Sequence, residues 1–93
     1  MPTIKLQILG EDILTSIYYS NDDCPIARAF KRLGFKNVFV YPAIAILNHQ
    51  QSDESRIEIT ELNTRIRMMY LYKYTSGESG IIPADFEYEL AYE

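Results

Sequence analysis

The sequence contains few of the side chains from which most reaction centres are built. Its 93 residues include one cysteine, one histidine and no tryptophan. A single cysteine cannot form an intrachain disulfide, so the sequence favours a reducing compartment. One cysteine and one histidine also fall short of the four ligands of a structural zinc site. No P-loop, dinucleotide fingerprint or nucleophile elbow is present. We therefore expect no metal and no cofactor.

Positive charge and long apolar runs are also scarce. Nine lysines and arginines stand against thirteen aspartates and glutamates, which gives a net charge of −4. Binding to phosphates needs a basic surplus, so nucleic acid is disfavoured as a partner. The longest apolar run, residues 38–47, contains Pro42. It is shorter than the roughly 18 residues that span a bilayer, so we expect no membrane segment.

What the sequence does contain is typical of one small folded domain, residues 1–93. Alternating apolar and polar positions predict strands over residues 3–9, 56–60 and 84–92. β-Branched and aromatic residues predict two more, over residues 13–19 and 37–47. The first of these could pair with residues 3–9 as a hairpin, and Pro42 should divide the second, because proline cannot donate to a strand ladder.

Residues 24–33 carry the clearest helix signal. Polar residues suited to capping precede this segment, and Pro25 fits the first helical turn. Ile26, Phe30 and Leu33 recur at helical spacing, and a glycine follows. We expect these three side chains to face the sheet, where burial stabilises the fold by roughly 1.5–3 kcal/mol each.

Residues 61–74 fit two structures. As a helix, they place five residues on one stripe, with Thr60 as a candidate cap: Leu62, Ile66, Met69, Tyr70 and Lys73. As a strand, they place the tyrosines on one face. The length favours a helix and the tyrosine content favours a strand, and the helix is our preferred interpretation. The sequence thus predicts the α+β class, with a small, mainly antiparallel sheet and one or two packed helices.

Cys24 is the one candidate nucleophile. It lies at the predicted start of a helix, where the helix dipole lowers the pKa of a thiol. Asp22 and Asp23 oppose that effect, and the only histidine, His49, lies in a polar loop. We expect a buried or capping cysteine, no catalytic residue and no enzymatic activity.

Three carboxylates, Asp85, Glu87 and Glu89, recur at every second position near the C-terminal end. Acid–base catalysis needs carboxyl groups in unlike environments, with at least one of them desolvated. Three carboxylates on one exposed strand face would all stay ionised. We expect this acidic row to keep the protein soluble and to protect a strand edge.

Charge is segregated along the chain. Residues 28–36 carry only basic groups, among them Arg28, Lys31 and Arg32, whereas residues 78–93 carry only acidic ones. Such surfaces are solvated, pair within the monomer, or meet a partner of opposite charge. A basic helix face beside aromatic rings could also bind a nucleotide or another small anionic ligand.

Large apolar groups lie close together over residues 68–74. Both faces of this segment carry them, whichever structure it adopts, and a small domain has little interior to receive both. We therefore expect an interaction surface here. The candidate interaction residues are Arg28, Lys31, Arg32, Met68, Tyr70 and Tyr72.

The motif Asp-Cys-Pro-Ile-Ala-Arg-Ala-Phe-Lys-Arg, residues 23–32, resembles a motif of an uncharacterised group of small bacterial and phage proteins. The corresponding motif of that group reads roughly Asp-Cys-Pro-Leu-Ala-Arg-Ala-Leu-x-Arg. Residues 74–77 and 82–90 resemble the group's ending, although Thr75 replaces an acid and Ala84-Asp85 are inserted. The resemblance implies a bacterial or phage origin, with the protein in a bacterial or host cytosol or associated with a virion.

These observations predict a small non-enzymatic protein-interaction protein. It would act as a virion component or as an inhibitor of a host protein, and self-association into a homo-oligomer is compatible with the same surface. The alternative is a small-ligand or nucleotide-binding protein that uses the basic helix face at residues 28–36.

Overall fold

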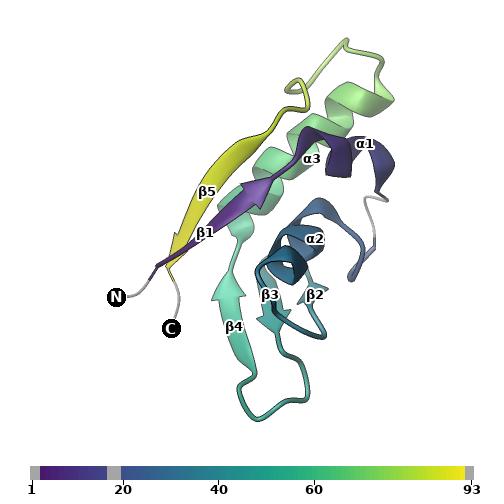
Figure 1. The fold of residues 1–93 in the computed structure, drawn as a ribbon. Coiled ribbons are helices and arrows are strands. Elements are labelled where there is room, and N and C mark those ends of the chain that lie inside the picture. Colours follow the sequence, from purple (N-terminus) through teal and green to yellow (C-terminus); the bar gives the residue numbers. More distant parts are fainter. Residues whose placement is uncertain (1–2, 17–19, 92–93) are drawn as a thin grey trace.

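The computed structural model describes residues 3–16 and 20–91 (Figure 1). They form an α+β fold with two antiparallel sheets, which confirms the predicted class, although one sheet was expected. In chain order the elements are β1 (Thr3–Ile8), α1 (Gly10–Thr15), α2 (Pro25–Arg32), β2 (Phe39–Val40), β3 (Ile44–Leu47), β4 (Ser55–Glu58), α3 (Thr60–Tyr74) and β5 (Phe86–Ala91).

The first sheet joins the two ends of the described chain. β1 and β5 pair antiparallel, with Thr3 opposite Ala91 and Ile8 opposite Phe86, and they lie side by side in Figure 1. The possible hairpin between residues 3–9 and 13–19 is not formed by the described residues, because residues 13–15 are helical and β1 pairs with β5. Residues 17–19 lie outside the described part of the chain.

The second sheet has the order β2-β3-β4. As predicted, Pro42 separates two short strands, β2 and β3. These two strands pair antiparallel, with Phe39 opposite Ile46 and Val40 opposite Ala45. β3 and β4 pair from Leu47 opposite Ser55 to Ile44 opposite Glu58. The predicted strand at residues 56–60 is thus confirmed over residues 56–58, whereas Ile59 caps α3 and Thr60 begins it.

α1 replaces the strand that β-branched residues predicted. Its first N–H, that of Gly10, donates to Asp85 Oδ1 at 2.8 Å. At its other end, Lys73 Nζ donates to the carbonyls of Ile13 and Leu14 at 3.1 and 3.0 Å. Side chains distant in sequence therefore satisfy both helix ends, and these tertiary contacts outweigh the local strand preference.

α2 forms as its sequence predicts. Pro25 occupies the first turn, and Ile26 and Phe30 are buried. Leu33, however, is 51 % exposed, so the prediction that it faces the core is wrong. It is the residue at which the helix ends, and Gly34, with a φ of +103°, then turns the chain in a left-handed conformation that glycine adopts without strain.

α3 confirms the helical interpretation of residues 61–74. Four of the five residues of the predicted stripe are buried, namely Leu62, Ile66, Met69 and Tyr70, and the fifth, Lys73, is half-buried. α3 begins at Thr60, with Ile59 as the cap residue and no side-chain capping bond, so the prediction that Thr60 caps the helix is wrong. The helix packs on the β1–β5 sheet, where Arg65 lies over the ring of Phe86 at 4.1 Å.

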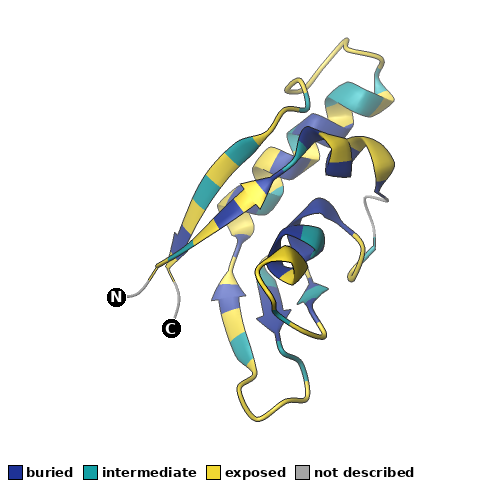
Figure 2. Ribbon diagram, in the orientation of Figure 1, coloured by how far each residue is buried: buried dark blue, intermediate teal, exposed yellow. Residues whose placement is uncertain are grey.

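One apolar core holds these layers together. The buried side chains of both sheets and all three helices form a single cluster, in which Leu6, Phe30, Leu47 and Leu62 are fully buried. Figure 2 shows buried residues where the elements face one another and exposed residues along the outer surfaces. Among the described residues, no helix is both long and apolar enough to cross a bilayer.

Candidate functional site

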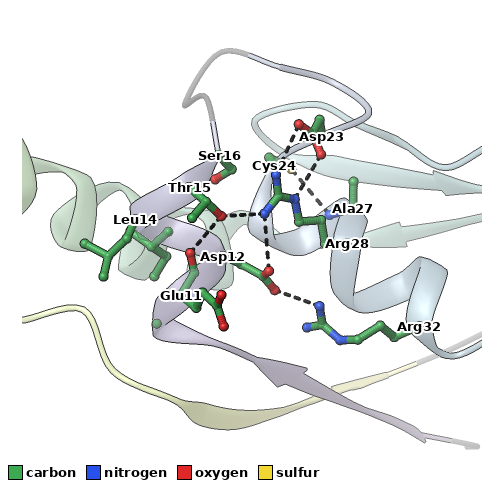
Figure 3. A network of polar contacts seen from close by, with 12 residues as sticks. Glu11, Asp12, Leu14, Thr15, Ser16, Asp23, Cys24, Ala27, Arg28 and Arg32 are labelled. Atoms are coloured by element: carbon green, nitrogen blue, oxygen red, sulfur yellow. Dashed lines mark hydrogen bonds and ion pairs between the residues drawn. The ribbon is translucent and has the colours of Figure 1, made fainter.

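The basic face of α2 is bound by neighbouring residues of the same chain. Arg28 Nε donates to Asp23 Oδ1 at 2.9 Å, and its Nη1 donates to Thr15 Oγ1 at 2.7 Å. The same Nη1 lies 3.4 Å from Asp12 Oδ1 (Figure 3). Arg28 thus connects α2 to its own N-terminal loop and to α1.

Asp12 joins two arginines. Its other carboxylate oxygen accepts a hydrogen bond from Arg32 Nη1 at 2.7 Å, and Arg32 Nη2 donates to the carbonyl of Gln7 at 2.8 Å. The Asp12 side chain is only 10 % exposed. A carboxylate buried to this extent needs such partners, because an unpaired buried charge is strongly destabilising. Figure 3 shows Asp12 between the two guanidinium groups.

The guanidinium groups of Arg28 and Arg32, which an anionic ligand would need, are thus already paired within the chain. The hydrogen bond from Arg28 lowers the pKa of Asp23, and the same contact raises the pKa of Arg28. Lys31 Nζ donates to the carbonyl of Asp22. Three of the four basic residues of the predicted face, Arg28, Lys31 and Arg32, therefore have partners within the chain, and those partners come from α1, β1 and the loop before α2 rather than from the acidic strand.

Cys24 is a structural cap. Its Sγ accepts a hydrogen bond from the N–H of Ala27 at 3.4 Å, and the residue is 6 % exposed. Burial raises the pKa of the thiol, so the neutral form, which is a poor nucleophile, prevails at neutral pH. The expectation of a buried, capping cysteine is confirmed.

His49 has partners of its own. Its Nδ1 lies 3.0 Å from Glu54 Oε2, and its ring packs edge-on against Phe39 with 5.2 Å between ring centroids. Among the described residues, no contact joins it to Cys24. No group of three or more histidine, cysteine, aspartate or glutamate side chains within residues 3–16 and 20–91 could hold a metal ion.

The predicted row of carboxylates is divided. β5 begins at Phe86, so Asp85 precedes the strand. The Asp85 carboxylate accepts a hydrogen bond from the N–H of Gly10. The prediction that Asp85 shares an exposed strand face with Glu87 and Glu89 is therefore wrong. Glu87 and Glu89 are exposed, as expected.

The aromatic part of α3 is only partly at the surface. Tyr70 is 2 % exposed, and its hydroxyl is hydrogen-bonded to Ser16. Burial raises the pKa of Tyr70 to about 12. Its ring stacks on that of Tyr74, which is 60 % exposed. Of the predicted interaction residues on this helix, Tyr70 thus belongs to the core, while Met68 and Tyr72 are half-buried.

The chain after α3 folds back onto the helix. The N–H of Ile81 donates to the carbonyl of Met68 at 3.0 Å, and the N–H of Gly77 donates to the carbonyl of Tyr72 at 2.9 Å. Gly80 makes the closest approach, since a Cβ there would lie 2.2 Å from the Met68 carbonyl oxygen. Only glycine permits this contact, and Ile81 follows it directly.

Five exposed apolar side chains lie on α1, on the last turns of α3 and on the returning chain, three segments that occupy the same part of the molecule in Figure 1. We call this surface the apolar end, and it consists of Leu14, Leu71, Tyr74, Ile81 and Ile82. Lys73 joins it to α1 through the carbonyl of Leu14, and the Leu71 Cβ lies against Gly80. Figure 2 shows that this part of the molecule is mostly exposed.

The apolar end includes residues that sequence reasoning missed. Leu14 was placed in a strand, and Ile81 and Ile82 lie in a segment for which the sequence predicts no regular element. A signal was present, because two consecutive isoleucines between a glycine and Pro83 are unusual in a solvated loop. Only the fold shows that they lie beside α3.

Comparisons with family models, with curated proteins and with solved structures find no match for this chain.

Proposed function

We propose that this protein is a non-enzymatic interaction protein that binds a partner protein through its apolar end. The observation that carries the proposal is the collection of exposed side chains on α1, α3 and the returning chain. Ile82 is 63 % exposed, Tyr74 is 60 % exposed and Leu14 is 58 % exposed. Exposed apolar surface of this kind is typical of protein interfaces, because its burial is favourable only against a partner.

The apolar end is also held in place. The hydrogen bond between Ile81 and Met68 and the close contact at Gly80 fix the returning chain, and Lys73 fixes α1 against α3. A surface that is ordered before binding loses less conformational entropy when it binds. This feature distinguishes the apolar end from apolar residues scattered over a surface, such as Leu33.

A non-enzymatic role is supported by the state of the reactive groups. Cys24 is buried, with a raised thiol pKa, and His49 is paired with Glu54. Nucleophilic catalysis needs an exposed, activated nucleophile within reach of a base.

The motif at residues 23–32 is the basis for proposing a bacterial or phage origin. The partner would then be a host protein that is inhibited, another virion component, or a second copy of this chain. The alternative, a nucleotide or small-ligand binder, has less support, because Arg28, Lys31 and Arg32 already have partners within the chain.

Quantitative affinity capture from the host cell tests the proposal. Three tagged proteins are compared: the natural chain, the double variant Leu71→Ser with Tyr74→Ser, and the control Leu33→Ser. Leu33 is a matched control because it is a leucine outside the apolar end that is exposed to 51 %, more than Leu71 at 40 %. Sedimentation velocity of the natural chain over a range of concentrations tests self-association in parallel.

The expected result is a partner that the natural chain and Leu33→Ser retain and that the double variant loses by about tenfold or more, as for residues at the centre of an interface. If the partner is a second copy, the same pattern will be seen in sedimentation. Equal retention by all three proteins would contradict the proposal, provided that circular dichroism shows them equally folded.

A further inference from the structure

Within the described part of the chain, the outer edge of β5 has no hydrogen-bonded partner strand, and β4 lies close to β5 without pairing with it. β5 pairs with β1 on one side, and among the described residues no backbone hydrogen bond joins residues 86–91 to any other segment. The opposite edge of that sheet is covered, because α2 packs on β1 and Arg32 donates to the carbonyl of Gln7. Unpaired strand edges readily accept another extended chain.

The contact at Gln7 shows which backbone groups of β5 point outward. In an antiparallel strand, the N–H and C=O of one residue point to the same side, and that side alternates along the strand. Because the Gln7 carbonyl meets Arg32, it points away from β5. Its register partner is Glu87, and Lys5 stands opposite Glu89. The backbone groups of Glu87 and Glu89 therefore point toward the outer edge.

Acidic side chains surround this edge. Glu87 and Glu89 are exposed on the outer face of the sheet. Gln7 stands opposite Glu87, and Lys5 is the one base opposite this pair, at Glu89. A groove of about 320 Å³ lies beside this strand, between residues 58–62 and 88–91. Glu58, Glu61 and Glu89 line it, and no lysine or arginine does so.

We propose that the outer edge of β5 binds an extended segment of a partner protein that carries basic residues at alternating positions. Backbone hydrogen bonds to Glu87 and Glu89 would hold the segment as a further strand of the β1–β5 sheet. Its basic side chains would lie beside these two carboxylates, where the opposite charges are complementary. This surface is separate from the apolar end, so the two proposals are tested independently.

A second copy of this chain is a poor occupant of the edge. Antiparallel pairing of β5 with β5 of another copy would place glutamates opposite or beside glutamates. Like charges that face each other across strands are destabilising. Charge complementarity therefore selects a basic partner over self-association at this surface.

The test uses a short synthetic peptide of alternating lysine and valine, blocked at both ends, titrated into ¹⁵N-labelled protein. The expected shifts are centred on the amides of β5, and the Glu87 and Glu89 amides exchange with solvent more slowly when the peptide is bound. A second peptide carries N-methyl groups on the backbone nitrogens of one edge. It keeps every charge but cannot donate to the strand, so its binding should be weaker by about tenfold or more.

Protein variants complete the test. The double variant Glu87→Lys with Glu89→Lys should lose the lysine peptide and bind an alternating glutamate–valine peptide. Glu78→Lys, which changes an exposed acid in the turn after α3, should bind the lysine peptide as the natural chain does, and so should the apolar-end double variant. Equal binding of the N-methylated peptide, shifts centred outside β5, or no binding at millimolar peptide would each overturn the proposal.

Discussion

Replacing Gly80 with alanine should detach the returning chain from α3 and disorganise the apolar end. Gly80 has a φ of +93°, and an added Cβ would lie 2.2 Å from the Met68 carbonyl oxygen and 2.6 Å from the Tyr72 nitrogen. Both are backbone atoms of a helix, so neither can move aside. The returning chain must move instead, and the hydrogen bond from Ile81 to Met68 is then lost.

A matched control separates the clash from the conformational strain. Gly34 has a φ of +103°, but no atom lies within 4 Å of its added Cβ. Gly34→Ala should therefore cost only the left-handed strain, about 1–2 kcal/mol. Gly80→Ala adds the lost hydrogen bond and the lost packing of Met68 and Leu71, and we expect about 3 kcal/mol in total.

Urea unfolding of the natural chain and of both variants measures these losses. Amide resonances of residues 68–82 should shift in Gly80→Ala and stay in place in Gly34→Ala. Gly80→Ala should also lose the partner that the natural chain captures. Equal free energies of unfolding for the two variants, with unchanged resonances near Met68, would refute the view that Gly80 positions the apolar end.

Three further predictions concern the core and its titrating groups. Phe30→Ala should reduce the free energy of unfolding by about 3–5 kcal/mol, as measured in urea, because a fully buried ring leaves a cavity; a loss below 1 kcal/mol would contradict the packing described. Because the pKa of Tyr70 is raised from 10.0 to about 12, the unfolded state releases this proton first, so stability should be complete below pH 10 and fall as the pH rises to 12. In thermal melts, Tyr70→Phe should reduce the loss of stability between pH 10 and pH 12. A loss as large as in the natural chain would contradict this prediction. Cys24 should react with a disulfide reagent slowly in the native protein and rapidly in urea, because its thiol is buried and its pKa raised; fast native labelling would mean an exposed thiol.

Local signals were sufficient for the elements with strong patterns. The spacing of Ile26 and Phe30 identified α2, the length of residues 61–74 favoured α3, and Pro42 marked the break between β2 and β3. In each case residues close together in the sequence determine the element, either through helical periodicity or, at Pro42, through the lack of a backbone N–H group.

Contacts between distant residues decided the rest. α1 is helical because Asp85 and Lys73 satisfy its ends, and both lie far along the chain. For the same reason the partner of β1 is β5 rather than its nearest neighbour. The sequence predicted an interaction surface over residues 68–74, but the part that Leu14, Ile81 and Ile82 contribute to the apolar end depends on tertiary contacts, among them the approach of Gly80 to α3. The internal pairing of Arg28 and Arg32 with Asp12 was equally hidden, because Asp12 lies 16 and 20 residues away from these arginines in the sequence.

Site-specific photocrosslinking tests the central claim, that the apolar end is the surface through which this protein acts. A photoreactive phenylalanine analogue is placed at the position of Leu71 and, in a second protein, at that of Leu33. Both are irradiated in intact host cells, and the adducts are identified by mass spectrometry. We predict a covalent adduct of defined mass from position 71 and none from position 33. No adduct at position 71, or the same adducts at both positions, would contradict the claim.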